Sequence, residues 1–216
     1  HVNTIAALAL TFKLAKTKEF KALQKQIVKN AQAMAKRFEE NGVKVSYYGT
    51  DTHLLLIDCK GFKGPDGVPL NGDLGARILD NVGIVTNRNT IPGDRSALSA
   101  TGIRIGSPWL TQRGYKEEHF EKIADLITKI FKASHPYLMC GRVGKKTRVK
   151  VDFKAYSEVQ SEVAKLAALM PSADTIEKPH GYPHFYTIDD EFPGETAAFE
   201  IYGERGSLRW SMMDAN

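Results

Sequence analysis

TGIRIGSP, at residues 101–108, is the stretch of the chain whose residue pattern is most informative about its fold. The pattern predicts a strand over Gly102–Gly106 in which Ile103 and Ile105 share one face and Arg104 projects from the other, because side chains alternate along a strand. Glycines at both ends of the strand allow a ligand or another backbone segment to come close. The planar guanidinium of an arginine in this place suits a carboxylate. An arginine on a solvated sheet face is the alternative that stays open.

A long polar loop, from Asn87 to Thr101, precedes this strand. Loops of this length in a compact domain often carry a function. Its asparagine amides can both donate and accept hydrogen bonds, which suits the edge of a heterocycle such as a pterin. Asparagine and glycine also serve as ordinary turn formers, so the residues alone leave both interpretations open.

Helices and short strands fill the rest of the chain. Apolar residues that recur every three or four positions predict helices, and short apolar runs bounded by turn residues predict strands. The expected helices are 3–17, 18–41, 73–81, 115–132 and 154–169, and the expected strands are 43–48, 53–59, 84–86, 102–106, 185–188 and 198–202. Together they predict an α/β protein in which helices cover a small antiparallel or mixed sheet. The first half of the first helix, Ile5 to Leu10, is apolar almost all round, so we expect it to be buried against other protein.

Composition and charge are those of a folded domain with an uneven charge distribution. The chain has 216 residues, of which 42% are hydrophobic and 25% charged, which excludes a wholly disordered or fibrous protein. The net charge is +5, but residues 171–216 contain nine acidic and three basic residues. The basic remainder suits an anionic ligand, such as a phosphate or a carboxylate, as well as it suits nucleic acid. The basic run 142–154 has no interleaved aromatic residues except Phe153, so we expect a solvated or acid-paired surface and no nucleic-acid partner.

Metal, disulfide and membrane signals are weak. Cys59 and Cys140 lie far apart and outside any CxxC pattern, so neither a disulfide framework nor a zinc module is indicated. His180 and His184 are four residues apart, but neighbouring prolines oppose a helical ligand pair, and we expect no metal site. No apolar run is long enough to cross a bilayer, and the start of the chain does not have the pattern of a secretory signal. We expect a cytoplasmic protein.

Four segments occur in one order that is similar to a known family. They are TDTHLLLID at 50–58, GIVTNRNTIPGD at 83–94, TGIRIGSP at 101–108 and TQRG at 111–114. From His1 to about His135 the chain resembles serine hydroxymethyltransferase, also called glycine hydroxymethyltransferase. The resemblance implies the carboxyl-terminal portion of a pyridoxal-phosphate transferase of fold type I. It also implies three parts, with helices from the end of the large domain and the linking helix at 1–41, the small domain at 42–135, and an extension of uncertain fold at 136–216.

The resemblance implies the activity and the site. The family uses pyridoxal phosphate to move a one-carbon unit between serine and tetrahydrofolate, leaving glycine, and we expect a homodimer or higher oligomer of the complete protein. Carried over by motif, Arg104 binds the amino-acid carboxylate. Asn89 and the segment Ser96, Ala97 and Leu98 lie where the family contacts the folate, although the family has an aromatic residue at the position of Leu98.

The residues that hold the cofactor in this family are expected upstream of His1. They are the Schiff-base lysine, the aspartate facing the pyridine nitrogen, the histidine on the ring and the glutamate used in proton transfer. We therefore expect no catalytic residue in this chain, which is expected to be a fragment or split part of a longer enzyme and inactive by itself. A non-catalytic binding or assembly module that keeps the small-domain fold is the alternative.

The remainder of the chain is less similar to known families. Residues 136 to about 170 resemble an extension of some long bacterial versions of the enzyme. AAFEIYGER, at 197–205, is faintly similar to the opening strand of a folate-binding aminomethyltransferase domain.

Overall fold

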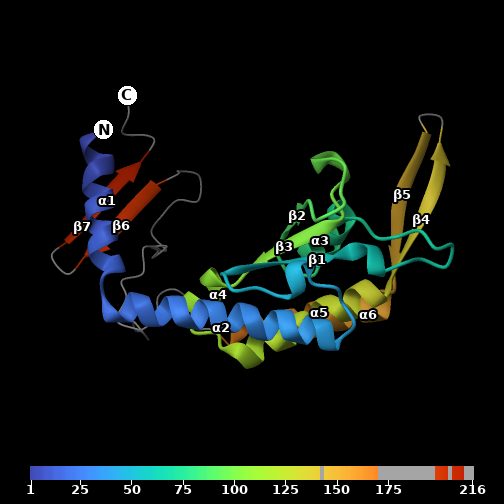
Figure 1. Cartoon of the computed structure of the whole chain (residues 1–216), viewed down its shortest axis with the longest axis horizontal. Helices are drawn as coiled ribbons and strands as arrows, with labels where there is room; N and C mark the ends of the chain where they lie inside the picture. The colour runs from blue at the N-terminus through green and yellow to red at the C-terminus, as the bar shows by residue number, and fades with distance from the viewer. Residues whose placement is uncertain (142–143, 170–197, 204–205, 212–216) are drawn as a thin grey trace. The chain divides into compact units, whose positions relative to one another are not determined.

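A computed structural model describes residues 1–141, 144–169, 198–203 and 206–211 (Figure 1). The chain divides into two compact units. One is Lys25–Leu169, and the other contains His1–Gln24 together with the described strands near the carboxyl end. The Lys25–Leu169 unit contains Arg104 and all the other predicted site residues. The predicted α/β fold class is confirmed, with helices and small antiparallel sheets.

Two helices open the chain, as the sequence predicts. α1 spans Val2–Ala15 and α2 spans Lys18–Glu40. No side chain of α1 is buried among the described residues, and most of its apolar side chains are exposed. α2 buries a stripe of side chains at helical spacing, which includes Ile27, Ala31, Met34 and Phe38.

A three-stranded antiparallel sheet forms the centre of the Lys25–Leu169 unit. β1 (Leu54–Asp58) and β2 (Asn87–Asn89) flank β3 (Gly102–Gly106) in the order β1-β3-β2. One face of the sheet is apolar and buried, with Leu55, Ile57, Ile103 and Ile105. This face positions the site, because the residues between these side chains must project from the opposite face.

Helix α3 (Gly72–Asn81) packs on the apolar face and meets α5 (Glu117–Lys132). A Cβ atom added to Gly75 of α3 would lie 2.8 Å from Ile103 Cδ1 and 3.4 Å from Phe131 Cζ. The helix can therefore approach the sheet this closely only because residue 75 has no side chain. Both helices agree with the predicted ranges to within two residues at each end.

The predicted strand 43–48 is wrong. Val45 forms a single bridge with Ile57, and a 3-10 turn, η1 (Ser46–Tyr48), follows at once. Tyr47 and Tyr48 both have φ near 60°, a left-handed conformation that cannot continue a strand. The apolar and aromatic composition of this segment predicts a strand, but its backbone leaves the edge of β1 after the single bridge between Val45 and Ile57.

The predicted strand 84–86 is also wrong, because the edge strand β2 begins three residues later at Asn87. Residues 82–84 are used to close α3. Gly83, with φ of +89°, donates its N–H to the Asp80 carbonyl, and the Ile84 N–H bonds to the Leu79 carbonyl at 2.8 Å. The first residues of the predicted long loop, 87–89, are therefore part of the sheet.

A hairpin and a helix complete the Lys25–Leu169 unit. The short helix α4 (Pro108–Gln112) leads to α5, after which β4 (Ser134–Gly141) and β5 (Gly144–Val151) pair in antiparallel fashion. α6 (Phe153–Ala168) matches the predicted helix and packs on α5. Lys129 Nζ lies 2.7 Å from Glu158 Oε2, and the Tyr115 hydroxyl donates to the Leu166 carbonyl at 3.0 Å.

The carboxyl-terminal part contributes one described strand pair. β6 (Ala198–Gly203), which the sequence predicts, pairs with β7 (Gly206–Ser211), which it does not. The predicted strand 185–188 and the pair His180 and His184 lie outside the described residues. In the described ranges no group of histidine, cysteine and acidic residues could hold a metal ion, and no helix has the length and apolar character to span a membrane.

Candidate functional site

Arg104 lies on β3 and points away from the buried face of the sheet, as its alternation with Ile103 and Ile105 predicts. Its side chain is exposed, whereas both isoleucines are buried. Leu56 of β1 and Asn87 of β2 are its partners across the two ladders. None of the described carboxylates forms an ion pair with Arg104. All five guanidinium donors are therefore available to a ligand on this open face.

Asn89 shares the open face with Arg104. It lies opposite Gly102 in the pairing of β2 with β3, one diagonal step from Arg104, and diagonal neighbours of this kind are about 7–8 Å apart. The Asn89 Nδ2 donates to the Thr90 carbonyl at 2.8 Å, which leaves its side-chain oxygen free to accept. The register of β2 thus brings together two of the predicted site residues.

The base of the loop that follows β2 is a tight turn. Ile91 accepts a backbone hydrogen bond from Asp94 at 3.0 Å, with Pro92 second and Gly93, at φ of +96°, third in the turn. This is the residue order of a type II turn, in which proline fixes the second position and glycine tolerates the positive φ of the third. The turn brings the Asp94 side chain back toward the backbone of the loop's own ends.

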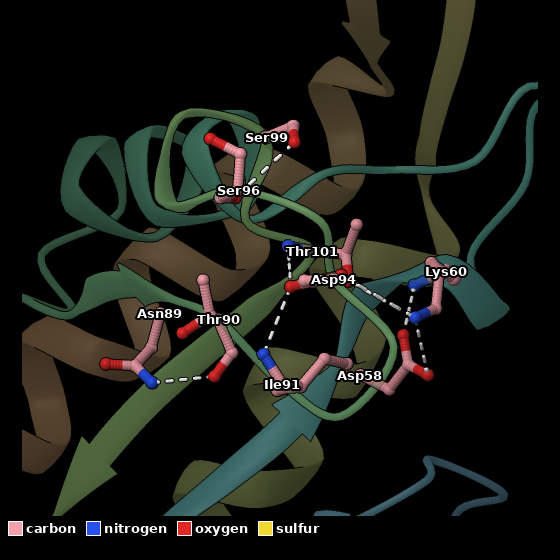
Figure 2. A network of polar contacts seen from close by, with 9 residues as sticks. All are labelled: Asp58, Lys60, Asn89, Thr90, Ile91, Asp94, Ser96, Ser99 and Thr101. Carbon is pink, nitrogen blue, oxygen red and sulfur yellow. Dashed lines mark hydrogen bonds and ion pairs between the residues drawn. The ribbon is translucent and has the colours of Figure 1, made fainter.

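Asp94 is the centre of a polar cluster at this base (Figure 2). Its Oδ2 accepts the backbone N–H groups of Ile91 at 3.0 Å and Thr101 at 2.9 Å, and its Oδ1 accepts the Thr101 hydroxyl. Burial by itself would raise the pKa of the Asp94 carboxyl, but these hydrogen bonds and the nearby Lys60 ammonium outweigh it and hold that pKa below its usual value. Asp94 is therefore an ionised acceptor at neutral pH.

Lys60 joins this cluster to the end of β1. Its Nζ donates to Thr101 Oγ1 at 3.2 Å and lies 3.6 Å from Asp58 Oδ2 and 3.9 Å from Asp94 Oδ1. Figure 2 shows the ammonium between the two carboxylates. The backbone N–H of Lys60 also bonds to Asp58 Oδ1 at 2.9 Å. We call Asp94, Thr101, Lys60 and Asp58 the loop clamp.

The tip of the loop, residues 95–99, is exposed. It contains the other predicted folate contacts, Ser96, Ala97 and Leu98, and the Leu98 side chain is 85% exposed. Among the described residues, the hydrogen bonds of the tip are local: Leu98 N–H to Ser96 Oγ at 3.2 Å, and the Ser99 N–H and hydroxyl to the Ser96 carbonyl. No described contact joins the tip to Arg104.

Sequence reasoning missed the loop clamp. A local signal for part of it was present, since proline and glycine followed by aspartate is typical of a tight turn whose acidic side chain accepts backbone N–H groups. Nothing local indicates that Lys60 lies beside Asp94, because the two residues are brought together only by the pairing of β1 with β3.

The described residues do not provide a site for pyridoxal phosphate. The cofactor's aldehyde requires a lysine whose amine can lose its proton, as a desolvated lysine away from carboxylates can. Every described lysine except Lys60 is exposed, and Lys60 lies between Asp58 and Asp94 as a paired cation.

Cys59 does not offer an alternative nucleophile. Cys59 is free and buried, and burial together with the neighbouring Asp58 charge raises the pKa of its thiol to about 12. Cys140 is free and exposed on β4.

The hairpin of β4 and β5, which we call the basic hairpin, is solvated where it is described. The basic residues of β5 are all exposed: Lys145, Lys146, Arg148 and Lys150.

Comparisons with known proteins point to the same family as the four ordered segments. A family model described as serine hydroxymethyltransferase matches residues 1–127. The chain is 38% identical over 186 residues to a probable cytosolic serine hydroxymethyltransferase of Schizosaccharomyces pombe, a match that covers 81% of this chain and 38% of that protein. It is 40% identical over 169 residues to the mitochondrial protein of the same organism, which covers 78% of this chain and 33% of that protein.

A third relative shows the highest identity of these three over a shorter stretch. A putative mitochondrial serine hydroxymethyltransferase of Neurospora crassa is 46% identical over 135 residues, which cover 60% of this chain and 24% of that protein. The matched part of the chain thus spans about a quarter to two fifths of the length of these curated relatives.

Proposed function

Because the chain belongs to the serine hydroxymethyltransferase family, we propose that it is part of a longer enzyme that transfers a one-carbon unit between serine and tetrahydrofolate. In that enzyme, residues 42–135 are the small domain, residues 1–41 are the helices that lead into it, and residues 136–216 are an extension. The observation that carries the proposal is the unpaired Arg104 on the open face of the sheet, beside Asn89.

Arg104 binds the carboxylate of serine or glycine. Two parallel N–H donors of a guanidinium match the two oxygens of a carboxylate, and such charge-assisted pairs are stronger than neutral hydrogen bonds. Because β3 is the central strand of the sheet, the backbone that carries Arg104 is held on both sides. The amino acid is thus bound in one orientation rather than merely attracted.

Asn89 and the loop tip bind the folate. The free side-chain oxygen of Asn89 can accept a hydrogen bond from an N–H group of a pterin, while its Nδ2 is held by the Thr90 carbonyl. Ser96, Ala97 and Leu98 add an exposed polar and apolar surface at the tip. Pyridoxal phosphate, when bound by the rest of the enzyme, supplies the electron sink for the chemistry of the amino acid.

The alternative is a non-catalytic binding or assembly module that keeps the small-domain fold. The exposed apolar surface of α1 is the observation in its favour, since exposed apolar patches often mark interfaces with other protein. The two functions differ in what they require of Arg104, because an assembly module has no use for an amino-acid anchor.

Assembly and location complete the proposal. The complete protein is a homodimer or higher oligomer, which light scattering after size-exclusion chromatography tests. It is cytoplasmic, and cell fractionation tests this against the mitochondrial location that some relatives have in their names.

The decisive experiment joins this chain to the upstream part of its own gene product and measures conversion of serine and tetrahydrofolate. The enzyme hypothesis expects turnover that depends on pyridoxal phosphate and falls at least tenfold in Arg104→Ala. Lys44→Ala, an exposed cation elsewhere in the same unit, is the matched control and should keep full turnover. A complete protein that does not turn over would favour the assembly module.

A further inference from the structure

We propose that Asp94 is the positioning residue of the folate site, which holds the exposed loop tip (residues 95–99) in place relative to Arg104 and Asn89. The inference rests on the proposed function, because it assigns a role in that function to a residue outside the predicted contacts. Three features of the loop carry it.

The first feature is that one side chain closes the loop. Asp94 Oδ2 accepts the N–H groups of both Ile91 and Thr101, which are ten positions apart, at 3.0 and 2.9 Å. These two residues lie at the two ends of the segment that contains the tip. Without this carboxylate the two N–H groups would have no acceptor among the described residues, and the loop beyond the pair Asn89 and Gly102 would lose the side chain that ties its two ends together.

The second feature is that nothing else described holds the tip. The hydrogen bonds that residues 95–99 form with described residues stay within the tip, and all five residues are exposed. A segment of this kind moves with the residues at its ends. The position of Ser96 and Leu98 is therefore set at Asp94 on one side. On the other side it is set at the buried Ala100, whose carbonyl accepts the Gly72 N–H at 3.0 Å, and at Thr101, which the carboxylate joins to Asp94.

The third feature is that the clamp is fixed to the sheet that carries the amino-acid anchor. The Thr101 carbonyl accepts the Cys59 N–H at 3.0 Å, and Lys60 Nζ donates to the Thr101 hydroxyl at 3.2 Å. The Ile91 side chain is buried against Gly102, where an added Cβ would lie 2.3 Å from Ile91 Cγ2. Arg104 is two residues beyond Gly102 on the same strand. The clamp thus sets the distance between the tip and the anchor.

A purely structural role for Asp94 is the competing explanation, and the two differ in selectivity. If Asp94 only stabilised the fold, its loss would weaken the binding of serine and of folate alike. A positioning role weakens folate binding, whereas Arg104, on the central strand, keeps its affinity for the amino acid.

The test uses the complete enzyme and measures the equilibrium binding of tetrahydrofolate and of glycine separately, beside a thermal melt. Asp94→Asn keeps the size of the side chain but replaces an acceptor oxygen by an NH₂ group. We expect tetrahydrofolate affinity to fall about tenfold or more, as for the loss of a hydrogen bond to a charged group, and glycine affinity to stay within twofold. Asp66→Asn, an exposed aspartate of another loop, is the matched control and should bind both ligands as the wild type does.

Two milder variants of Thr101 keep the inference testable if Asp94→Asn does not fold. Thr101→Ser keeps the hydroxyl that donates to Asp94 and should bind folate normally, whereas Thr101→Val removes that donor and should lose part of the folate affinity. Unchanged folate affinity in Asp94→Asn, or an equal loss of both ligands, overturns the inference alone. A wild-type complete protein that does not bind tetrahydrofolate overturns the proposed function and this inference together.

Discussion

Asn87 of β2 lies directly opposite Arg104 of β3, so both side chains project from the open face of the sheet. Leu56 occupies the other flank of Arg104, on β1. The guanidinium is thus placed between an amide and an apolar side chain, with no described carboxylate to pair with it. This arrangement leaves the cation available to a ligand.

Substitution of Arg104 should separate ligand binding from folding. In the complete enzyme, Arg104→Lys keeps the charge but loses the two-pronged geometry, and we expect glycine affinity to fall about tenfold or more. Arg104→Ala should lose more, because it also removes the charge. The melting temperature should hardly change, since the side chain is exposed. Unchanged glycine binding in Arg104→Ala would remove the anchor role, and a collapsed melt would make the arginine structural.

The two glycines that flank Arg104 should respond differently to substitution. A Cβ at Gly102 would lie 2.3 Å from Ile91 Cγ2 and 2.9 Å from the Asn89 carbonyl oxygen, whereas at Gly106 the nearest atom would be 3.6 Å away. We expect Gly102→Ala to destabilise the unit by about 1–3 kcal/mol, the usual cost of overpacking, and Gly106→Ala to be close to neutral. Denaturant titration of the two variants checks this, and equal stabilities would contradict it.

Sequence patterns could predict the parts of the fold that depend on neighbouring residues. The stripe of α2 and the alternation of Ile103, Arg104 and Ile105 are local, and both are present in the structure. The position of the edge strand β2 was not predictable in this way. Asn87–Asn89 has no apolar alternation, and it is a strand because β3 offers it a partner. Tyr47 and Tyr48 are of a residue type that is common in strands, but their positive φ angles exclude a strand.

The candidate site likewise has a part that local sequence predicts and a part that depends on how the chain folds. Arg104 could be predicted from its strand, but its closeness to Asn89 is a matter of register between strands that the sequence does not specify. Asp94 could have been read as a turn residue. Its link with Lys60 joins the turn that follows β1 to the loop that follows β2, and only the folded chain shows it.

Pyridoxal phosphate should not bind covalently to this chain by itself. Its described lysines are exposed or, in the case of Lys60, paired with carboxylates, so none lies in a closed site away from carboxylates. Titration with the cofactor, recording the visible absorbance of a lysine adduct, should give no saturable change. A single lysine trapped by borohydride, identified by mass spectrometry, would contradict this expectation.

The basic hairpin should bind nucleic acid only weakly. Arg148 of β5 lies opposite Tyr137 of β4, and the Lys150 ammonium lies 5.4 Å from the centre of the Tyr137 ring, which leaves less of that ring for a base to stack on. We expect a dissociation constant in the non-specific range, about 1 μM or weaker at physiological salt. Fluorescence anisotropy with a labelled oligonucleotide measures it. Submicromolar binding with a steep salt dependence, lost in Arg148→Ser, would contradict the prediction.

Asp125 should make the stability of the Lys25–Leu169 unit depend on pH. It lies on α5 and accepts two hydrogen bonds from Arg37 of α2, at 2.8 and 3.0 Å, and one from Asn41 at 2.7 Å. Partial burial tends to raise the pKa of this carboxyl, but these contacts outweigh it and lower that pKa in the folded state.

The lowered pKa determines the sign of the effect. A carboxyl with a folded pKa below its unfolded value of about 3.9 stabilises the protein fully above that value, and the contribution is lost as the pH falls toward the folded pKa. Asp125→Asn should therefore lower the melting temperature at pH 7 by about 2–4 °C at most, as for a surface ion pair. The gap between wild type and variant should narrow below about pH 4. Glu121→Gln removes an exposed carboxylate from the same helix. It should change neither the melting temperature at pH 7 nor the way the melting temperature depends on pH. A difference in melting temperature between the wild type and Asp125→Asn that stays constant down to pH 3 would show that Asp125 contributes through packing rather than through its charge.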